Sequence, residues 1–332
     1  MASEIGIDLG TSNTIIYLKG KGIVVNEPTV VAISRATGKI LSIGIEAGEM
    51  LGRTPVDICA VTPIKGGVIA NFDITVAMLK YFIKKAINSS ILKPKAVVCI
   101  PSHITDVEKR AVRDAVLAAG VKEVFLIEKS MAAAIGAGIA VNAPVGSMIV
   151  DIGGGTTEIA VISLGGIVTT QSLKVASHTL DNDIIQYMKK NHNLVIGNIT
   201  AEEIKKEVGS ACSLKEELSI TIKGRDLVSG LPRTETVTSE EIREAIQESL
   251  AAVIDGIKAV LEKTPPELAA DIFESGIVLT GGGAILKGLG KLINVHTQIP
   301  IYMAESPSEC VAIGAGKTLE EVKNLHSIII AD

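Results

Sequence analysis

The stretch "MIVDIGGGTTEIAVISLGGIV", residues 148–168, decides the fold because a similar stretch, "IGIDLGTSNTIIYLKGKGIV", occupies residues 5–24. In both, an apolar run ends in an aspartate, Asp8 or Asp151, and a turn rich in Gly and Thr follows. A second β-rich run then leads to Gly-Ile-Val. Each stretch is typical of a β-hairpin with a tight glycine turn. The repeat therefore predicts two related domains.

Two such turns, facing each other across a cleft, would form a phosphate-binding site. Glycines let the backbone approach closely and direct N–H groups at phosphate oxygens, and Thr and Ser hydroxyls add donors. Asp8 and Asp151 are predicted to hold Mg²⁺ through its water shell, because hard oxygen ligands suit this ion. The alternative is that both stretches are ordinary hairpin turns. That alternative would not explain why an aspartate stands at the same offset in both. The predicted phosphate-binding residues are Gly10, Thr11, Ser12, Asn13, Gly153, Gly154, Gly155, Thr156 and Thr157.

The composition favours an α/β protein. At 332 residues the chain is long enough for roughly two domains of ordinary size. Hydrophobic residues make up 47% of the chain but aromatic residues only 2%, so the core must consist of Ile, Val, Leu and Ala. Short β-branched runs such as "KAVVCIP" (95–101) suit strands buried on both faces of a sheet. We therefore expect layered sheets and helices.

Charge and cysteine content exclude several classes of protein. A net charge of −5 without a basic cluster gives no support for nucleic-acid binding. Four cysteines without a C-x-x-C pair and five scattered histidines argue against a disulfide framework or a zinc site. The opening "MASEIGIDLG" enters a strand almost at once, so no signal peptide is expected. These features predict a cytoplasmic protein.

A third glycine cluster, "IVLTGGGAILKGL" (277–289), is predicted to bind adenosine. It follows an apolar strand and precedes a helix, where the backbone can approach a flat ligand. No G-K-[ST] follows, and the G-x-G-x-x-G spacing is absent, so it is neither a Walker nor a dinucleotide motif. The alternative is close packing of a helix on a strand. The predicted contacts are Gly281, Gly282, Gly283 and Ala284.

The stretch "TAEEIKKEVGSA" (200–211) predicts a helix that starts with a capping box, Thr200 with Glu203. Glu203, Lys206 and Glu207 share one face of this helix. That face is predicted to contact ribose and adenine, with a solvated charge stripe as the alternative. A second capping box, Thr105 with Glu108, starts a helix that Gly120 ends.

Further segments carry a resemblance to a known family. They include "KGKGIVVNEPTVVAI" (19–33), "LGRTP" (51–55), "PIKGGVIANFD" (63–73), "SGLPRT" (229–234), "TPPELAADI" (264–272) and "CVAIGAGKTLE" (310–320). With the glycine turns, they resemble the actin and sugar-kinase ATPase superfamily, and most closely the MreB family of bacterial actins. "SGLPRT" and "TPPELAADI" serve no nucleotide role, which makes them specific to this family.

The resemblance implies an actin-like ATPase fold of two ribonuclease-H-like domains, with ATP or ADP and Mg²⁺ in the cleft between them. Domain I would comprise residues 1–144 plus 310–332, with a small insertion at about 34–68. Domain II would comprise residues 145–309, with an insertion at about 181–242. The resemblance also implies a homopolymer of protofilaments on the inner membrane face, working with other cell-shape proteins.

The stretch "LIEKSMAAAIGAG" (126–138) departs from the family pattern. The MreB pattern here is Glu-Glu-Pro, whose second Glu is thought to position the attacking water, whereas this chain has Lys129 and then Ser130. An ammonium has no acceptor for water, so we expect ATP binding with weak hydrolysis. In the family the water-positioning Glu is paired with a Thr, which is present here as Thr156. Glu128 is the one nearby residue that could replace the missing Glu. Alternatively, Lys129 points to solvent. The alanine run suits close approach of another backbone.

A second departure is "ASHTLD" (176–181), in place of the family's Gly-Asp turn. This change also suggests relaxed catalysis, and we expect neither departure to touch the phosphate turns. The family's membrane-binding loop corresponds to Ile91 and Leu92, beside Lys93 and Lys95. Two apolar side chains bury little area, so filament avidity would be required. The alternative is that both pack beneath the loop.

The superfamily resemblance leaves two other functions open, those of a sugar kinase and a chaperone ATPase. A sugar kinase would need a base poised over a bound hydroxyl and a sugar pocket, and no distinct insertion supplies them. A chaperone ATPase would need a further substrate domain after "GAGKTLEEVKNL" (314–325). The ATP-binding filament protein is therefore the leading expectation, with the kinase as the alternative.

Overall fold

The computed structural model describes residues 3–87 and 92–320, and its first half is built on a sheet of order β3-β2-β1-β9-β10. Strands β1, β2 and β3 form an antiparallel meander, and β9 and β10 extend the sheet in parallel with β1. The strands are β1 (Glu4–Leu9), β2 (Asn13–Leu18), β3 (Gly22–Pro28), β9 (Lys95–Ile100) and β10 (Glu123–Glu128).

A second sheet repeats this arrangement in the order β13-β12-β11-β17-β18. It again combines an antiparallel meander with two parallel strands beside the first strand. The strands are β11 (Ser147–Ile152), β12 (Thr157–Ser163), β13 (Gly166–Leu173), β17 (Ile277–Thr280) and β18 (Ile301–Met303). Asp8 lies near the end of β1 and Asp151 near the end of β11. The sequence repeat is thus a structural repeat, as predicted.

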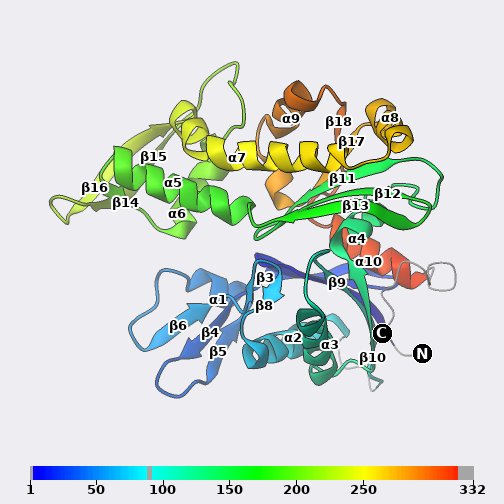
Figure 1. The fold of residues 1–332 in the computed structure, drawn as a ribbon. Helices are drawn as coiled ribbons and strands as arrows, with labels where there is room; N and C mark the ends of the chain where they lie inside the picture. Colours follow the sequence, from blue (N-terminus) through cyan, green and yellow to red (C-terminus); the bar gives the residue numbers. More distant parts are fainter. Residues whose placement is uncertain (1–2, 88–91, 321–332) are drawn as a thin grey trace.

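Helices cover both sheets, which form the lower and upper halves of the molecule in Figure 1. In the first half α2 packs on β2 and β3, and α3 packs on β10. In the second half α7 packs on β12 and β13, α8 on β11 and α9 on β18. These helices are α2 (Phe72–Ile87), α3 (Asp106–Ala118), α7 (Ser239–Glu262), α8 (Pro266–Ser275) and α9 (Leu289–Thr297).

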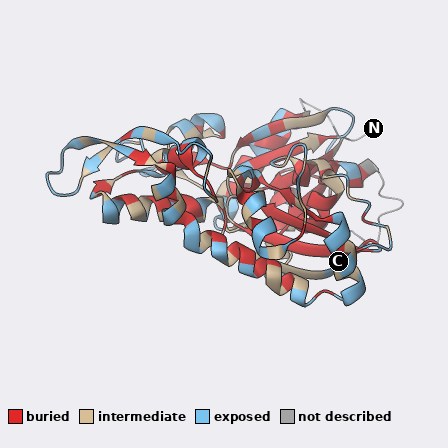
Figure 2. Ribbon diagram, turned by 90° about the horizontal axis from the view of Figure 1, so that it is seen from above, coloured by how far each residue is buried: buried red, intermediate tan, exposed pale blue. Residues whose placement is uncertain are grey.

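Two smaller sheets project beyond the main ones. The sheet of order β5-β4-β6 lies beside helix α1, and the sheet of order β14-β15-β16 lies beside helices α5 and α6. The first comprises β4 (Val31–Ser34), β5 (Ile40–Ile43), β6 (Ile58–Val61) and α1 (Ile45–Glu49). The second comprises β14 (Leu194–Val195), β15 (Ser219–Asp226), β16 (Pro232–Thr238), α5 (Ser177–Asn191) and α6 (Asn198–Val208). The β15–β16 hairpin is largely exposed (Figure 2).

These small sheets fall at the two expected insertions. Strand β4 begins at Val31, three residues before the first expected boundary, and a short hairpin of β7 (Ile64–Lys65) and β8 (Val68–Ile69) follows β6. The second small sheet and its helices lie between 177 and 238. The domain boundaries themselves stay predictions.

Two small-residue helices cross between the main sheets. Helix α4 (Lys129–Gly136) packs on α10 (Cys310–Glu320). A Cβ on Gly136 would lie 1.9 Å from the carbonyl oxygen of Cys310, and one on Gly314 would lie 1.8 Å from that of Ala132. Only glycine fits at such distances. The alanine-glycine run therefore allows the close backbone approach that we expected.

Of the two predicted capping boxes, one forms. Thr105 caps α3, with reciprocal hydrogen bonds to Glu108. The prediction for Thr200 is wrong, because α6 begins at Asn198 with Gly197 as its N-cap. The backbone N–H of Ala201 already donates to the carbonyl of Gly197, at 3.0 Å. Thr200 therefore lies inside the first turn.

In residues 3–87 and 92–320, every helix is too short or too polar to cross a bilayer. The uncharged run 130–150 folds as α4, a turn and the start of β11.

Candidate functional site

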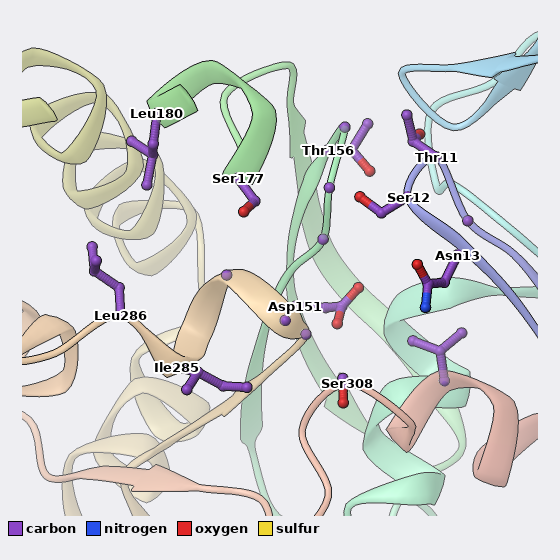
Figure 3. A pocket seen from close by; sticks show the side chains of 18 of the residues that line it. Thr11, Ser12, Asn13, Asp151, Thr156, Ser177, Leu180, Ile285, Leu286 and Ser308 are labelled. Carbon is purple, nitrogen blue, oxygen red and sulfur yellow. The ribbon is translucent and has the colours of Figure 1, made fainter. Parts of the chain in front are cut away.

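A cavity of about 760 Å³ lies between the two turns of the repeat, a size typical of small-molecule sites. Its lining combines residues from both main sheets, from α6 and from the glycine cluster that follows β17. In Figure 3, Thr11, Ser12 and Asn13 stand on one side and Thr156 faces them from the other. The repeat thus brings together the residues on which the phosphate prediction rests.

Most of the predicted phosphate-binding residues line this cavity. They are Gly10, Thr11, Ser12, Asn13, Gly153, Gly154, Gly155 and Thr156. Thr157 is the exception, because it is the first residue of β12 and is fully buried. Its hydroxyl donates to the carbonyl of Val175, at 2.7 Å. Thr157 is therefore a structural residue, and its assignment to phosphate is corrected.

The two turns touch each other. A Cβ on Gly154 would lie 2.0 Å from the Ser12 Oγ, and one on Gly155 would lie 2.5 Å from the Thr11 Oγ1. At both glycines a larger side chain would require Ser12 or Thr11 to move. Many backbone N–H groups can converge on one anion here.

The segment 176–181 contacts these turns, contrary to expectation. The N–H groups of Ser177 and His178 donate to the carbonyls of Gly153 and Gly154, at 3.1 and 2.9 Å. The His178 Nε2 also shares a hydrogen bond of 2.8 Å with the Ser12 hydroxyl. Burial is the main cause that lowers the pKa of His178. The second departure from the family pattern thus joins the two halves.

Lys129 points into the cavity and not to solvent. Its side chain is buried, and its Nζ lies 2.8 Å from the Asp8 Oδ1. Burial acts to lower the pKa of Lys129, but the carboxylates of Asp8 and Asp151 raise it above its ordinary value. The lysine is therefore a fixed positive charge. The alternative that it points to solvent is wrong.

Asp151 is buried and accepts a hydrogen bond of 3.0 Å from the Thr280 hydroxyl. Burial raises its pKa to about 7, although Lys129 acts to lower it. The carboxylate of Asp8 adds to the rise. At neutral pH this group is thus divided between its acid and its anion.

The two aspartates are a poor fit for the predicted Mg²⁺ site. Asp8 is paired with the Lys129 ammonium, and Asp151 is buried and accepts a hydrogen bond from the Thr280 hydroxyl. Among the described residues, no cluster of three or more His, Cys, Asp or Glu side chains could hold a metal ion. The positive charge next to Asp8 is supplied by the Lys129 side chain.

Glu128 lies apart from the described lining of the cavity. It is the last residue of β10, opposite Ile100 of β9. Its Oε2 is buried and has no hydrogen-bond partner among the described residues. Its predicted role as a substitute for the water-positioning group has no support from this position.

The glycine cluster after β17 lines the other end of the cavity. Gly281, Gly282 and Gly283 border it, whereas Ala284 is buried beneath. Gly281 has φ +85°, and a Cβ there would lie 2.2 Å from the carbonyl oxygen of Ile152. Leu180, Ile285 and Leu286 add apolar surface (Figure 3). This wall is suited to a flat apolar ring.

The face of α6 in the cavity differs from the predicted one. Lys206 lines the cavity, but Glu203 and Glu207 are exposed and lie outside its described lining. In their place stand Glu202, Lys205 and Gly209, which share a face with Lys206 at helical spacing. Burial in the core of the second half fixes the orientation of α6, and therefore the face that borders the cavity. The buried residues are Ala201, Ile204 and Val208.

Sequence reasoning missed Lys205. Its Nζ lies 2.7 Å from the Asp181 Oδ1 and donates to the Ser177 hydroxyl and carbonyl, at 2.6 and 3.0 Å. The helical spacing of Ala201, Ile204 and Val208, taken as the buried stripe, would have placed the cavity face correctly. Of the predicted membrane pair, Ile91 lies outside the described residues, and Leu92 is 54% exposed.

Comparison with known proteins agrees with this architecture. The family model described as MreB/Mbl protein matches residues 2–327. The cell shape-determining protein Mbl of Bacillus cereus (strain ATCC 10987 / NRS 248) is 51% identical over 325 residues, which cover 98% of each chain. The cell shape-determining protein MreB of Escherichia coli (strain K12) is 49% identical over 327 residues, 97% of this chain and 94% of that one.

Solved structures give the same result. MreB5 of Spiroplasma citri bound to ADP superposes with a TM-score of 0.94 at 37% identity, covering 98% of this chain and 99% of that one. The same protein bound to AMPPNP gives the same TM-score. The MamK double helical filament, at 21% identity, has a TM-score of 0.83 and covers 97% of this chain and 99% of that one, which supports the fold alone. The chain has an actin-like fold and belongs to the MreB/Mbl family.

Proposed function

We propose that this chain binds adenine nucleotide in the cavity between its two glycine turns and polymerises into filaments that act in cell shape. The observation that carries the proposal is the convergence of the turns at Gly10–Asn13 and Gly153–Thr156 on one cavity. The nucleotide-bound MreB5 structures and the names of the curated relatives support it. The phosphates would lie between the turns, and the adenosine would lie against Gly281–Gly283, Ile285 and Lys206.

Calorimetric titration with ADP and with AMPPNP tests nucleotide binding. Replacement of Gly282 by Val should weaken binding strongly, because Gly282 lines the cavity and has open space around its Cα. The side chain would project into the space that the ligand needs. Gly166→Val is the matched control, since Gly166 lies on β13. Sedimentation of the natural protein with and without nucleotide then measures polymerisation. Absence of pelletable polymer under all nucleotide conditions would contradict the filament proposal.

The proposal also includes weak hydrolysis of ATP. Lys129 supplies donors only, so it cannot accept a hydrogen bond from an attacking water. Steady-state phosphate release by the natural protein should be slow, and Lys129→Glu should accelerate it while nucleotide affinity is checked in parallel. Rapid release by the natural protein would show that another group orients the water.

Attachment to the inner membrane face from the cytoplasm is also proposed. Leu92 is 54% exposed, as an anchor requires. Sedimentation with anionic liposomes, compared between the natural protein and the Ile91→Ser, Leu92→Ser double variant, tests the anchor. Equal sedimentation of the two proteins would rule it out.

The kinase alternative is not favoured, because full-length matches are to cell shape-determining proteins. ADP formation that common sugars stimulate would revive it.

A further inference from the structure

One buried cation lies where the repeat predicts a metal. Asp8 and Asp151 lie near the ends of the equivalent strands β1 and β11, and both border the cavity. The Lys129 Nζ lies 2.8 Å from the Asp8 Oδ1, and the side chains of this pair are 9% and 12% exposed. The carboxylate of Asp151 also acts electrostatically on this ammonium. Its surroundings are therefore those of a cation-binding site.

An ammonium at this position can perform the two tasks of a divalent cation. It neutralises buried carboxylate, which would otherwise repel a phosphate group, and it offers donors to phosphate oxygens. Lysine carries three N–H donors, and the Lys129 Nζ forms an ion pair with the Asp8 Oδ1 at 2.8 Å. Because Lys129 borders the cavity between the phosphate turns, its N–H donors can reach a ligand there. An ion held at Asp8 would have to displace the ammonium or lie beside it, against its charge.

The lysine is also held in place. It is the first residue of α4, whose backbone is locked against α10 at Gly136 and Gly314. The adjoining Ser130 is fully buried and its hydroxyl lies 3.2 Å from that of Ser102. The charge is thus positioned before any ligand arrives, which reduces the cost of ordering it on binding.

We propose that the Lys129 ammonium takes the place of the divalent cation in this site, so that the chain binds nucleotide without a need for Mg²⁺. This inference rests on the proposed nucleotide binding and specifies its ion requirement. The proposed site therefore differs from the Mg-nucleotide site that the repeat alone predicts.

Titration with ADP and AMPPNP, in Mg²⁺ and in EDTA, tests the inference by binding alone. For the natural protein we expect the two dissociation constants to agree within about twofold, whereas Lys129→Met should lose about tenfold or more in EDTA and recover in Mg²⁺. Methionine keeps the length of the side chain and removes its charge. Circular dichroism and thermal unfolding establish that the variant is folded.

Lys205→Met is the matched control. Lys205 is equally buried, borders the same cavity and pairs with Asp181 at 2.7 Å. Its replacement can alter nucleotide affinity, but the ratio between the Mg²⁺ and EDTA values should stay as in the natural protein. A ratio that rises as much as in Lys129→Met would overturn the specific role of Lys129.

A second measurement needs only the natural protein. Electron paramagnetic resonance of Mn²⁺ mixed with protein and ADP should show no more bound Mn²⁺ than ADP alone binds. Additional Mn²⁺ sites, or a tenfold loss of natural affinity in EDTA, would overturn the inference while nucleotide binding stands. Absence of nucleotide binding with and without Mg²⁺ would overturn the proposed function as well.

Discussion

The His178 Nε2 and the Ser12 Oγ lie 2.8 Å apart and join the start of α5 to the first phosphate turn. This hydrogen bond connects the two halves of the molecule at the cavity. His178 is also bonded through its backbone to Gly154 of the second turn. The residue therefore contacts both turns at once.

The lowered pKa of His178 predicts a pH-dependent stability. Its folded pKa lies below the ordinary 6.5, so the unfolded chain takes up this proton first as the pH falls. The free energy of unfolding should therefore decrease as pH drops below about 6.5 and through the folded pKa. His178→Gln should remove this part of the decrease. Urea unfolding at about pH 8 and about pH 5.5 measures it.

His296→Gln is the control for that prediction, because His296 is exposed on α9. Asp151, whose raised pKa acts in the opposite direction, is present in every variant and cancels in the comparison. An unchanged difference between the two pH values in His178→Gln would contradict the assignment.

The contact between the turns predicts a rescue by a second substitution. Gly154→Ala places a Cβ 2.0 Å from the Ser12 Oγ and 3.0 Å from its Cβ, and we expect a loss of roughly 1–3 kcal/mol in the free energy of unfolding. Ser12→Gly removes both atoms, so the double variant should recover much of that loss. A double-mutant cycle by urea unfolding measures the coupling. Strictly additive effects would show that the turns separate without cost.

The helix crossing predicts a strong effect at Gly136. A Cβ there would lie 1.9 Å from the carbonyl oxygen of Cys310. Because the obstacle is backbone, Gly136→Ala should cost about 1–3 kcal/mol or more in the free energy of unfolding. Gly166→Ala is the control, since its Cβ would meet only the Ser163 carbonyl oxygen at 3.7 Å. Equal stability of the two variants, measured by thermal unfolding, would contradict the crossing geometry.

The hydroxyl of Thr280 predicts a shift at Asp151. It donates to the carboxylate at 3.0 Å and so lowers the pKa, which burial raises to about 7. Thr280→Val should raise the pKa of Asp151 further. Because the folded pKa lies above the unfolded one, the added destabilisation should be present at neutral pH and disappear as the pH falls through these values.

Carbon-13 NMR titration of the carboxyl group measures the Asp151 shift directly. Thr264→Val is the control, because Thr264 is also buried and donates to the Val260 carbonyl, away from the cavity. A pKa of Asp151 that stays the same in Thr280→Val would show that this hydrogen bond does not stabilise the anion.

The local patterns predicted the architecture well. Each hairpin is specified by its own apolar run and glycine turn, so the equivalence of β1–β2 and β11–β12 is visible along the chain. The capping box at Thr105 is equally local. Such features need no knowledge of the rest of the fold.

The errors arose where tertiary packing decides. Thr157 has the residue type of a phosphate ligand, but its position at the start of β12 turns it inward to Val175. The cavity face of α6 was misplaced because Ala201 and Ile204 were not taken as the buried stripe that packs in the core. Lys129 could be recognised as unusual from sequence, but its contact with Asp8 depends on the tertiary placement of α4.

The repeat gives the molecule two copies of one sheet arrangement, but the charges of the two copies differ. In the parallel strand pairs, Asp8 lies opposite Cys99, whereas the equivalent Asp151 lies opposite Thr280. One aspartate is held by an ammonium and the other by a hydroxyl. A phosphate chain bound between them would therefore meet a polar field rather than two equal partners. The two halves of the duplicated scaffold therefore differ in charge, and a ligand between them would have one preferred orientation.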